Sequence, residues 1–141
     1  MKKIKYLCLL FSISFAISCE ENITTECEEE KMNTAVLTKF SDIQKNVFDT
    51  NCALSGCHAG TFLSAGLNLS NGKSYNALVN KTSSLNSNYK LVEPGNSENS
   101  FIIKMLKNTG ERTTIMPPSG KLKSSVIDSI SAWINRGALN N

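Results

Sequence analysis

Two cysteines and a histidine that could attach a haem lie close together in this chain. Four residues separate Cys52 from Cys57, and His58, the only histidine, follows directly. Two thiols can add across the two vinyl groups of a porphyrin, and an imidazole beside the second thiol can then reach the iron. We therefore expect a covalently bound haem c, with thioethers at Cys52 and Cys57 and with His58 as an iron ligand.

The spacing leaves other uses of these residues open. The usual attachment pattern has two residues between the cysteines, and this chain has four. Gly56 can relax the backbone and so accommodate the extra residues. Attachment through Cys57 alone, with Cys52 spare, is a second interpretation. A third is a Cys52–Cys57 disulfide, because thiols outside the cytoplasm tend to oxidise; His58 would then be a surface residue.

Met116 is the candidate for the opposite face of the iron. The chain has no second histidine, and a methionine thioether is a common sixth ligand that raises the reduction potential. Pro117 biases Met116 toward an extended backbone, and Pro118 stiffens the segment, so this loop can hold one side chain in place. Met105 stands at helical spacing from Phe101, which favours a core position. An open sixth position, available to small molecules, is the alternative.

Two amphipathic helices are expected at the two ends of the domain. The first, at residues 34–49, ends just before Asn51 and delivers the chain to the cysteines. The last, at residues 125–136, is followed by Gly137, a residue type that commonly caps helix C-termini. Apolar residues recur every three or four positions in both: Val36, Phe40, Ile43 and Val47 in the first, and Val126, Ile127, Ile130, Trp133 and Ile134 in the last.

The middle of the chain predicts one more main helix and long loops. Residues 97–107 form the helix, capped by Asn96 or Ser97, and residues 74–80 a short helical turn. No useful stretch alternates with a period of two, so the fold class is all-α. Long loops in a small domain are usually functional, and a haem would give them apolar surface to bury. Core positions are expected for three aromatic residues: Tyr75, Tyr89 and Trp133.

The order of the first helix, the cysteine motif, the Met-Pro loop and the last helix along the chain resembles that of a small monohaem c-type cytochrome. It resembles more closely the cytochrome c domains of exported bacterial proteins. In that family a helix enters the haem motif, a later Met-Pro segment supplies the sixth ligand, and a C-terminal helix crosses the first. The resemblance covers about Phe40 to Leu139. It implies a cytochrome c-like fold of three main helices and long loops around one haem. The motifs that carry it are Gly56-Cys57-His58, Gly66-Leu67-Asn68-Leu69, Val92-Glu93-Pro94-Gly95 and Met116-Pro117-Pro118.

The N-terminus predicts export and a lipid anchor. Residues 1–18 begin with three lysines, and the apolar stretch from Leu7 to Ile17 is too short for a stable membrane span. Small residues then precede Cys19, as in a bacterial lipobox, where the cysteine is diacylated and the chain is cut before it. An ordinary secretory signal with an incidental cysteine is the alternative. We expect a lipid anchor on Cys19 in the bacterial cell envelope, with the domain facing the periplasm or the exterior.

Charge is distributed unevenly along the remainder. Residues 19–33 contain six glutamates and read as an acidic, solvated tether, in which Cys27 is expected to be unpaired. After Lys31 there are eleven basic and six acidic residues. This excess could steer an acidic partner, but ordinary surface lysines are the favoured explanation. No basic cluster with interleaved aromatic residues occurs, so nucleic acid is not an expected partner. Residues 34–141 form the expected domain, a monomer.

These observations favour an electron carrier over an enzyme, with redox partner proteins and iron as the working metal. Two alternatives remain at this stage. A haem-free lipoprotein, stapled by a disulfide, would be a binding or structural module. A haem protein with an open sixth iron position would be a sensor or an enzyme.

Overall fold

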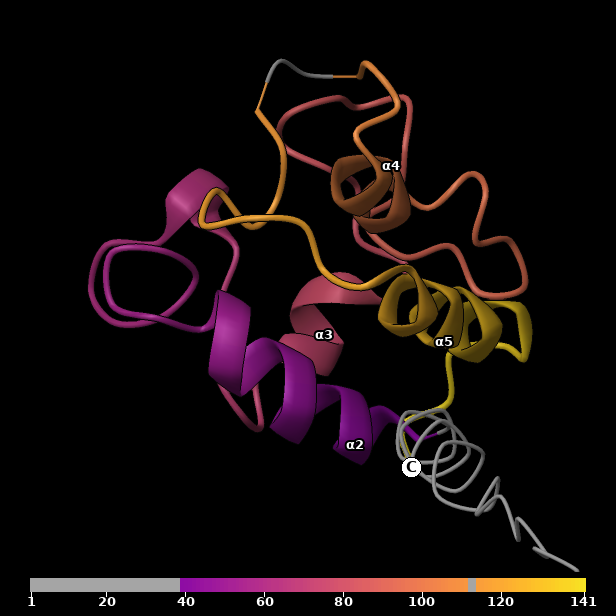
Figure 1. Ribbon diagram of the computed structural model, residues 1–141, viewed down its shortest axis with the longest axis horizontal. Helices are drawn as coiled ribbons and strands as arrows, with labels where there is room; N and C mark the ends of the chain where they lie inside the picture. The colour runs from indigo at the N-terminus through magenta and orange to yellow at the C-terminus, as the bar shows by residue number, and fades with distance from the viewer. Residues whose placement is uncertain (1–38, 112–113) are drawn as a thin grey trace, which may run out of the picture.

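Helices joined by loops make up the part of the chain that the structure describes (Figure 1). The computed structural model describes residues 39–111 and 114–141, so the predicted signal, tether and residues 34–38 lie outside it. Within these ranges there is no strand, and β-pairing is limited to isolated bridges. The elements are α2 (Phe40–Ile43), η1 (Gln44–Cys52), η2 (Ser64–Gly66), α3 (Ser74–Leu78), α4 (Phe101–Lys107) and α5 (Ser124–Asn135).

The first helix runs through Cys52 instead of stopping before it. The α-helical turn α2 passes directly into the π-helical η1, where Ala53 N–H donates to the Phe48 carbonyl five residues back, at 2.7 Å. The side-chain amide of Asn51 donates to a carbonyl of the preceding turn at 3.3 Å. The predicted end before Asn51 is therefore wrong, because these wider turns continue the helix. Segments of π-helix are rare and often occur at functional sites.

The last residue of the chain completes the first turn of α2. Helix N-termini leave N–H groups without intrahelical partners. Here Asn141 accepts hydrogen bonds from Phe40 N–H, at 3.0 Å through its side chain, and from Ser41 N–H, at 2.9 Å through its backbone oxygen. The Phe40 ring also lies 5.3 Å from Trp133 and 5.2 Å from Tyr75, measured between ring centroids. The two ends of the described domain are thus fastened together.

The C-terminal helix α5 agrees with the sequence prediction to within one residue at each end. The predicted cap is confirmed: Gly137 has a φ of +100° and its N–H donates to the Ile134 carbonyl at 2.9 Å. This left-handed region costs glycine little and other residues more. Four apolar side chains of the helix are buried: Ile127, Ile130, Trp133 and Ile134.

Helix α4 begins four residues later than the predicted helix at 97–107. The preceding residues use their hydrogen-bonding groups in local turns. The side chain of Asn96 accepts from Asn99 N–H at 3.1 Å, and the Ser100 hydroxyl donates to the Asn96 carbonyl at 2.8 Å. Such side-chain bonds to nearby backbone compete with helix formation. The short turn expected at 74–80 is confirmed as α3.

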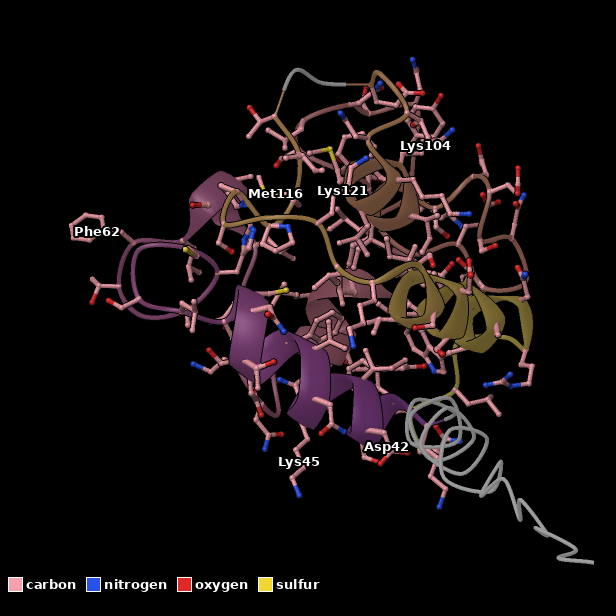
Figure 2. All side chains as sticks on the ribbon, in the orientation of Figure 1. Asp42, Lys45, Phe62, Lys104, Met116 and Lys121 are labelled. Carbon is pink, nitrogen blue, oxygen red and sulfur yellow. The ribbon has the colours of Figure 1, made fainter. Side chains whose placement is uncertain are left out.

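Buried residues from α2, η1, α3, α4 and α5 share one hydrophobic core, whereas charged Asp42 and Lys45 lie on the outer face of the first helix (Figure 2). Among residues 39–111 and 114–141, no helix is both long and apolar enough to cross a bilayer. The fully buried side chains of this core include Ile43, Phe48, Leu78, Val92, Ile130, Trp133 and Ile134.

Replacing Ile130 tests the contribution of α5 to this core. Ile130 is 0% exposed, so Ile130→Ala removes buried methylene groups and leaves a cavity. We expect the free energy of unfolding to fall by about 2–5 kcal/mol in denaturant titrations. Asp128→Ala, at an exposed site of the same helix, is the control and should stay within about 0.5 kcal/mol of the parent. Equal losses in the two variants would contradict this packing.

Candidate functional site

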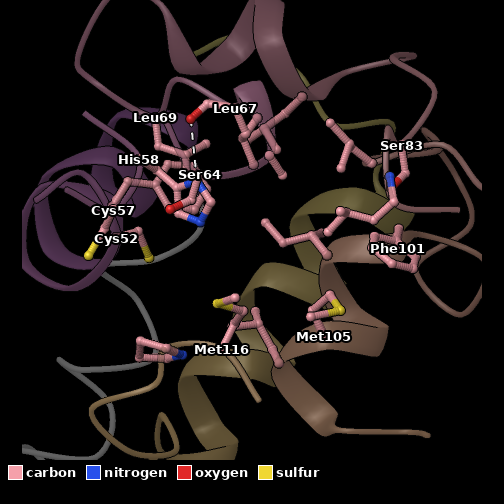
Figure 3. A pocket seen from close by; sticks show the side chains of 18 of the residues that line it. Cys52, Cys57, His58, Ser64, Leu67, Leu69, Ser83, Phe101, Met105 and Met116 are labelled. Carbon is pink, nitrogen blue, oxygen red and sulfur yellow. Dashed lines mark hydrogen bonds between the residues drawn. The ribbon is translucent and has the colours of Figure 1, made fainter. Parts of the chain in front are cut away.

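A mostly apolar cavity lies beside η1, the helix that carries Cys52 (Figure 3). Its volume is about 140 Å³, and together with its mouth it holds about 1010 Å³ of space between atoms. The cavity lining includes all four residues predicted to bind haem: Cys52, Cys57, His58 and Met116. Its apolar walls come from η1, the loop after the cysteines, α3, the segment before α4, and α4 itself: Val47, Phe48, Leu67, Leu69, Leu78, Leu91, Phe101, Ile102 and Leu106.

The two cysteines and the histidine form a closed loop at the end of η1. Cys57 N–H donates to the Leu54 carbonyl at 3.0 Å, and His58 N–H donates to the Cys52 carbonyl at 3.1 Å. Gly56 occupies the left-handed region at φ +79°, which agrees with its expected role in accommodating four intervening residues. Cys52 and Cys57 are both free thiols in the structure, so neither sulfur is used in the alternative disulfide.

The imidazole of His58 is oriented by a backbone carbonyl. His58 Nδ1 lies 3.3 Å from the Leu67 oxygen. A carbonyl only accepts, so Nδ1 is the donor in this pair, and in the neutral tautomer that makes this hydrogen bond the lone pair is on Nε2. Metal-binding histidines commonly make this second hydrogen bond, which fixes the tautomer and the ring orientation. The backbone of His58 is held too, since its carbonyl accepts from Leu69 N–H at 2.8 Å.

A buried glutamine ties residues 67–69 to the first helix. Gln44 is 4% exposed, and its amide nitrogen donates to the Leu69 carbonyl at 2.9 Å and to the Asp49 carboxylate at 2.6 Å. Its oxygen accepts from the Ser74 hydroxyl of α3. Sequence reasoning missed Gln44, because Leu69 and Ser74 are distant from it in sequence and a polar residue beside an apolar stripe is usually solvated.

Met116 approaches the cavity from the loop that joins α4 to α5. In Figure 3 the side chain of Met116 lies across the cavity from His58. Its N–H donates to the Met105 carbonyl at 3.4 Å, and Pro117, which follows it, is buried. The loop is thus attached to α4 at the predicted ligand, so a side chain outside the helices is held in place.

The site residues fit an iron porphyrin. His58 and Met116 supply two donors on opposite sides of the cavity, which suits a metal that brings a square of four ligands of its own. Apolar walls suit the faces of a porphyrin ring, because burial of apolar surface against them is favourable. Imidazole with thioether is an established donor pair for haem iron, and both candidate attachment thiols line the same space.

Not every residue near the site faces it. None of the three aromatic residues predicted to be core belongs to the described cavity lining. Tyr75 and Trp133 donate to the carbonyls of Ala138 and Leu139 near the C-terminus, at 3.0 and 2.9 Å. Tyr89 donates to Glu111 at 3.0 Å. Met105 is buried, as expected for a core residue, and it also lines the cavity.

Comparison with protein-family models, with curated proteins and with solved structures finds no match for this chain. We therefore infer its function from the cavity residues themselves. The predicted lipidation site, Cys19, lies outside the described residues.

The environment of Cys52 changes its acidity. Burial and, after it, the neighbouring Cys57 raise the pKa of the Cys52 thiol to about 11, from an ordinary 9.0. Both effects disfavour the thiolate, since a buried charge loses solvation and a second thiolate would repel it. Without haem, Cys52 is therefore a protonated thiol at neutral pH and a slow nucleophile.

Alkylation of haem-free protein, produced without a maturation system, measures this shift. The thiolate is the reactive form, so the rate at Cys52 should rise about tenfold per pH unit and level off only near pH 11. Peptide mapping after iodoacetamide treatment follows Cys52 separately from the other cysteines. Urea-unfolded protein is the control and should level off near pH 9. A plateau near pH 9 in the folded protein would refute the burial of this thiol.

Proposed function

We propose that this chain is a monohaem c-type cytochrome that transfers electrons and is held at the bacterial cell envelope by a lipid anchor. One observation carries the proposal. A single apolar cavity has an imidazole on one side, a thioether on the other, and two free thiols in its lining. These are the groups that covalent attachment and six-coordination of a haem iron require.

Each site residue has a distinct role. Cys52 and Cys57 form thioethers, each thiol adding its sulfur and its hydrogen across one vinyl double bond, so no atom is lost and no oxidant is needed. His58 holds the iron through Nε2, while its Nδ1–H is bound by the Leu67 carbonyl. Met116 would hold the iron through its thioether from the other side of the cavity, so that substrate would not reach the metal.

Such a site favours electron transfer over catalysis. The haem supplies the redox change between ferrous and ferric iron, while the protein sets the potential and the access. The thioether of Met116 favours the ferrous form and raises the potential. The cavity walls are mostly apolar, and Gln44 restrains the segment that orients His58. The donor and acceptor are redox partner proteins.

A cysteine-to-serine series tests the haem proposal. Protein made in a host with cytochrome maturation should retain haem after acid-acetone extraction. Reduced in alkaline pyridine, it should give the absorption maximum of a haem with two thioethers. Cys52→Ser and Cys57→Ser should each shift that maximum to longer wavelength, because each keeps one vinyl group. Ser55→Ala, in the same exposed loop, should match the parent. A colourless parent with Cys52 joined to Cys57 would refute the proposal.

The lipid anchor is tested by fractionation. Because a diacylated cysteine anchors strongly to a bilayer, the parent protein should sediment with membranes and leave them only in detergent. Cys19→Ala should prevent both the acylation and the cut that depends on it, so this variant should no longer incorporate labelled fatty acid. Cys27→Ala, in the same acidic segment, is the matched control and should still sediment. Release of the parent protein by salt or carbonate alone would contradict lipidation.

A further inference from the structure

The cavity holds two methionines rather than one. Met105 and Met116 both belong to its lining, and in Figure 3 both lie on the side away from His58. Met116 N–H donates to the Met105 carbonyl at 3.4 Å, so the two residues are neighbours although ten residues separate them in sequence. The part of the lining away from the imidazole thus includes two methionines, one from α4 and one from the loop after it.

Helix α4 directs Met105 toward the cavity. Positions 101, 102, 105 and 106 share one face of a helix, and all four of these residues line the cavity. Met105 is only 8% exposed. Ile103 of the same helix packs instead in the main hydrophobic core, a cluster that does not include Met105. Met105 therefore contributes its buried surface to the haem site.

A methionine can reach where a leucine cannot. Its side chain is unbranched, has three rotatable bonds and carries a polarizable sulfur. A thioether is neutral at every pH, so neither sulfur needs to lose a proton before binding iron. The backbone of Met105 belongs to helix α4. The backbone of Met116 belongs to the loop that is hydrogen-bonded to this helix. The two differ in attachment and not in donor chemistry.

We propose that Met105 is a reserve ligand for the iron position that Met116 occupies. This inference rests on the proposed haem function and extends it. When Met116 is removed or withdrawn, Met105 supplies a thioether from the same wall. Met105 would then hold the iron in its place and keep dioxygen and other small molecules from that position.

Three variants test the reserve role: Met116→Leu, Met105→Leu and the double variant. Leucine conserves side-chain volume, so each variant should keep the parent fold. The ferric absorption band from sulfur to iron should persist in both single variants and vanish in the double variant. Carbon monoxide should bind quickly to the ferrous double variant and slowly, if at all, to either single variant. Far-ultraviolet circular dichroism confirms that each variant is folded.

The outcomes separate this inference from the proposed function. If the parent protein carries haem and shows the sulfur band but Met116→Leu is high-spin, Met105 is not a reserve ligand. If Met105→Leu alone loses the band, Met105 is the resident ligand and the assignment is reversed. If the double variant keeps the band, the sulfur comes from neither residue. A parent protein without haem overturns the proposed function and the inference with it.

Discussion

The geometry of the site depends on one short segment, residues 67–69, which is held between the first helix and His58. The Leu67 carbonyl lies within hydrogen-bond distance of His58 Nδ1. The Leu69 N–H donates to the His58 carbonyl, and the Leu69 carbonyl accepts from the side-chain amide of Gln44. The leucine side chains of this segment also line the cavity. A shift of the segment would therefore turn the imidazole and reshape the apolar wall at the same time.

Loops can carry such a site because their buried polar side chains have hydrogen-bond partners. Within residues 39–111 and 114–141, no buried side-chain nitrogen or oxygen lacks a hydrogen-bond partner. An unsatisfied buried group would cost about 1–3 kcal/mol. The Gln44 amide illustrates this, since it joins η1, α3 and residues 67–69 through three partners. The loops are ordered by these bonds and by the core beneath them.

Much of this architecture follows from local patterns in the sequence. The stripe that includes Phe40, Ile43 and Val47 predicts the first helix, and the apolar face of residues 125–136 predicts α5 almost to its ends. These helices are recognisable because burial of one face imposes its period on the sequence. The late start of α4 was not predictable from this period, because side-chain hydrogen bonds of Asn96 and Ser100 decide it.

The site itself was predictable only in part. Residue type alone singles out the two cysteines and His58 in the cavity lining. Met116 is singled out by its type and by the two prolines that follow it. Met105 does not, because a helix face that lines a cavity has the same apolar period as one that packs in a core. Gln44 does not either, since its partners are brought together only by the tertiary fold. Exposed Phe62, on the loop after His58 (Figure 2), lies outside the cavity and has no assigned role.

The central claim is that an imidazole and a thioether face each other across a cavity that holds iron. X-ray absorption at the iron edge of the purified, oxidised protein tests it most directly. We expect a six-coordinate iron whose first shell contains one sulfur, with only nitrogen at the remaining positions. An iron shell without sulfur would contradict thioether ligation, and a purified protein without iron would contradict the proposed cytochrome function.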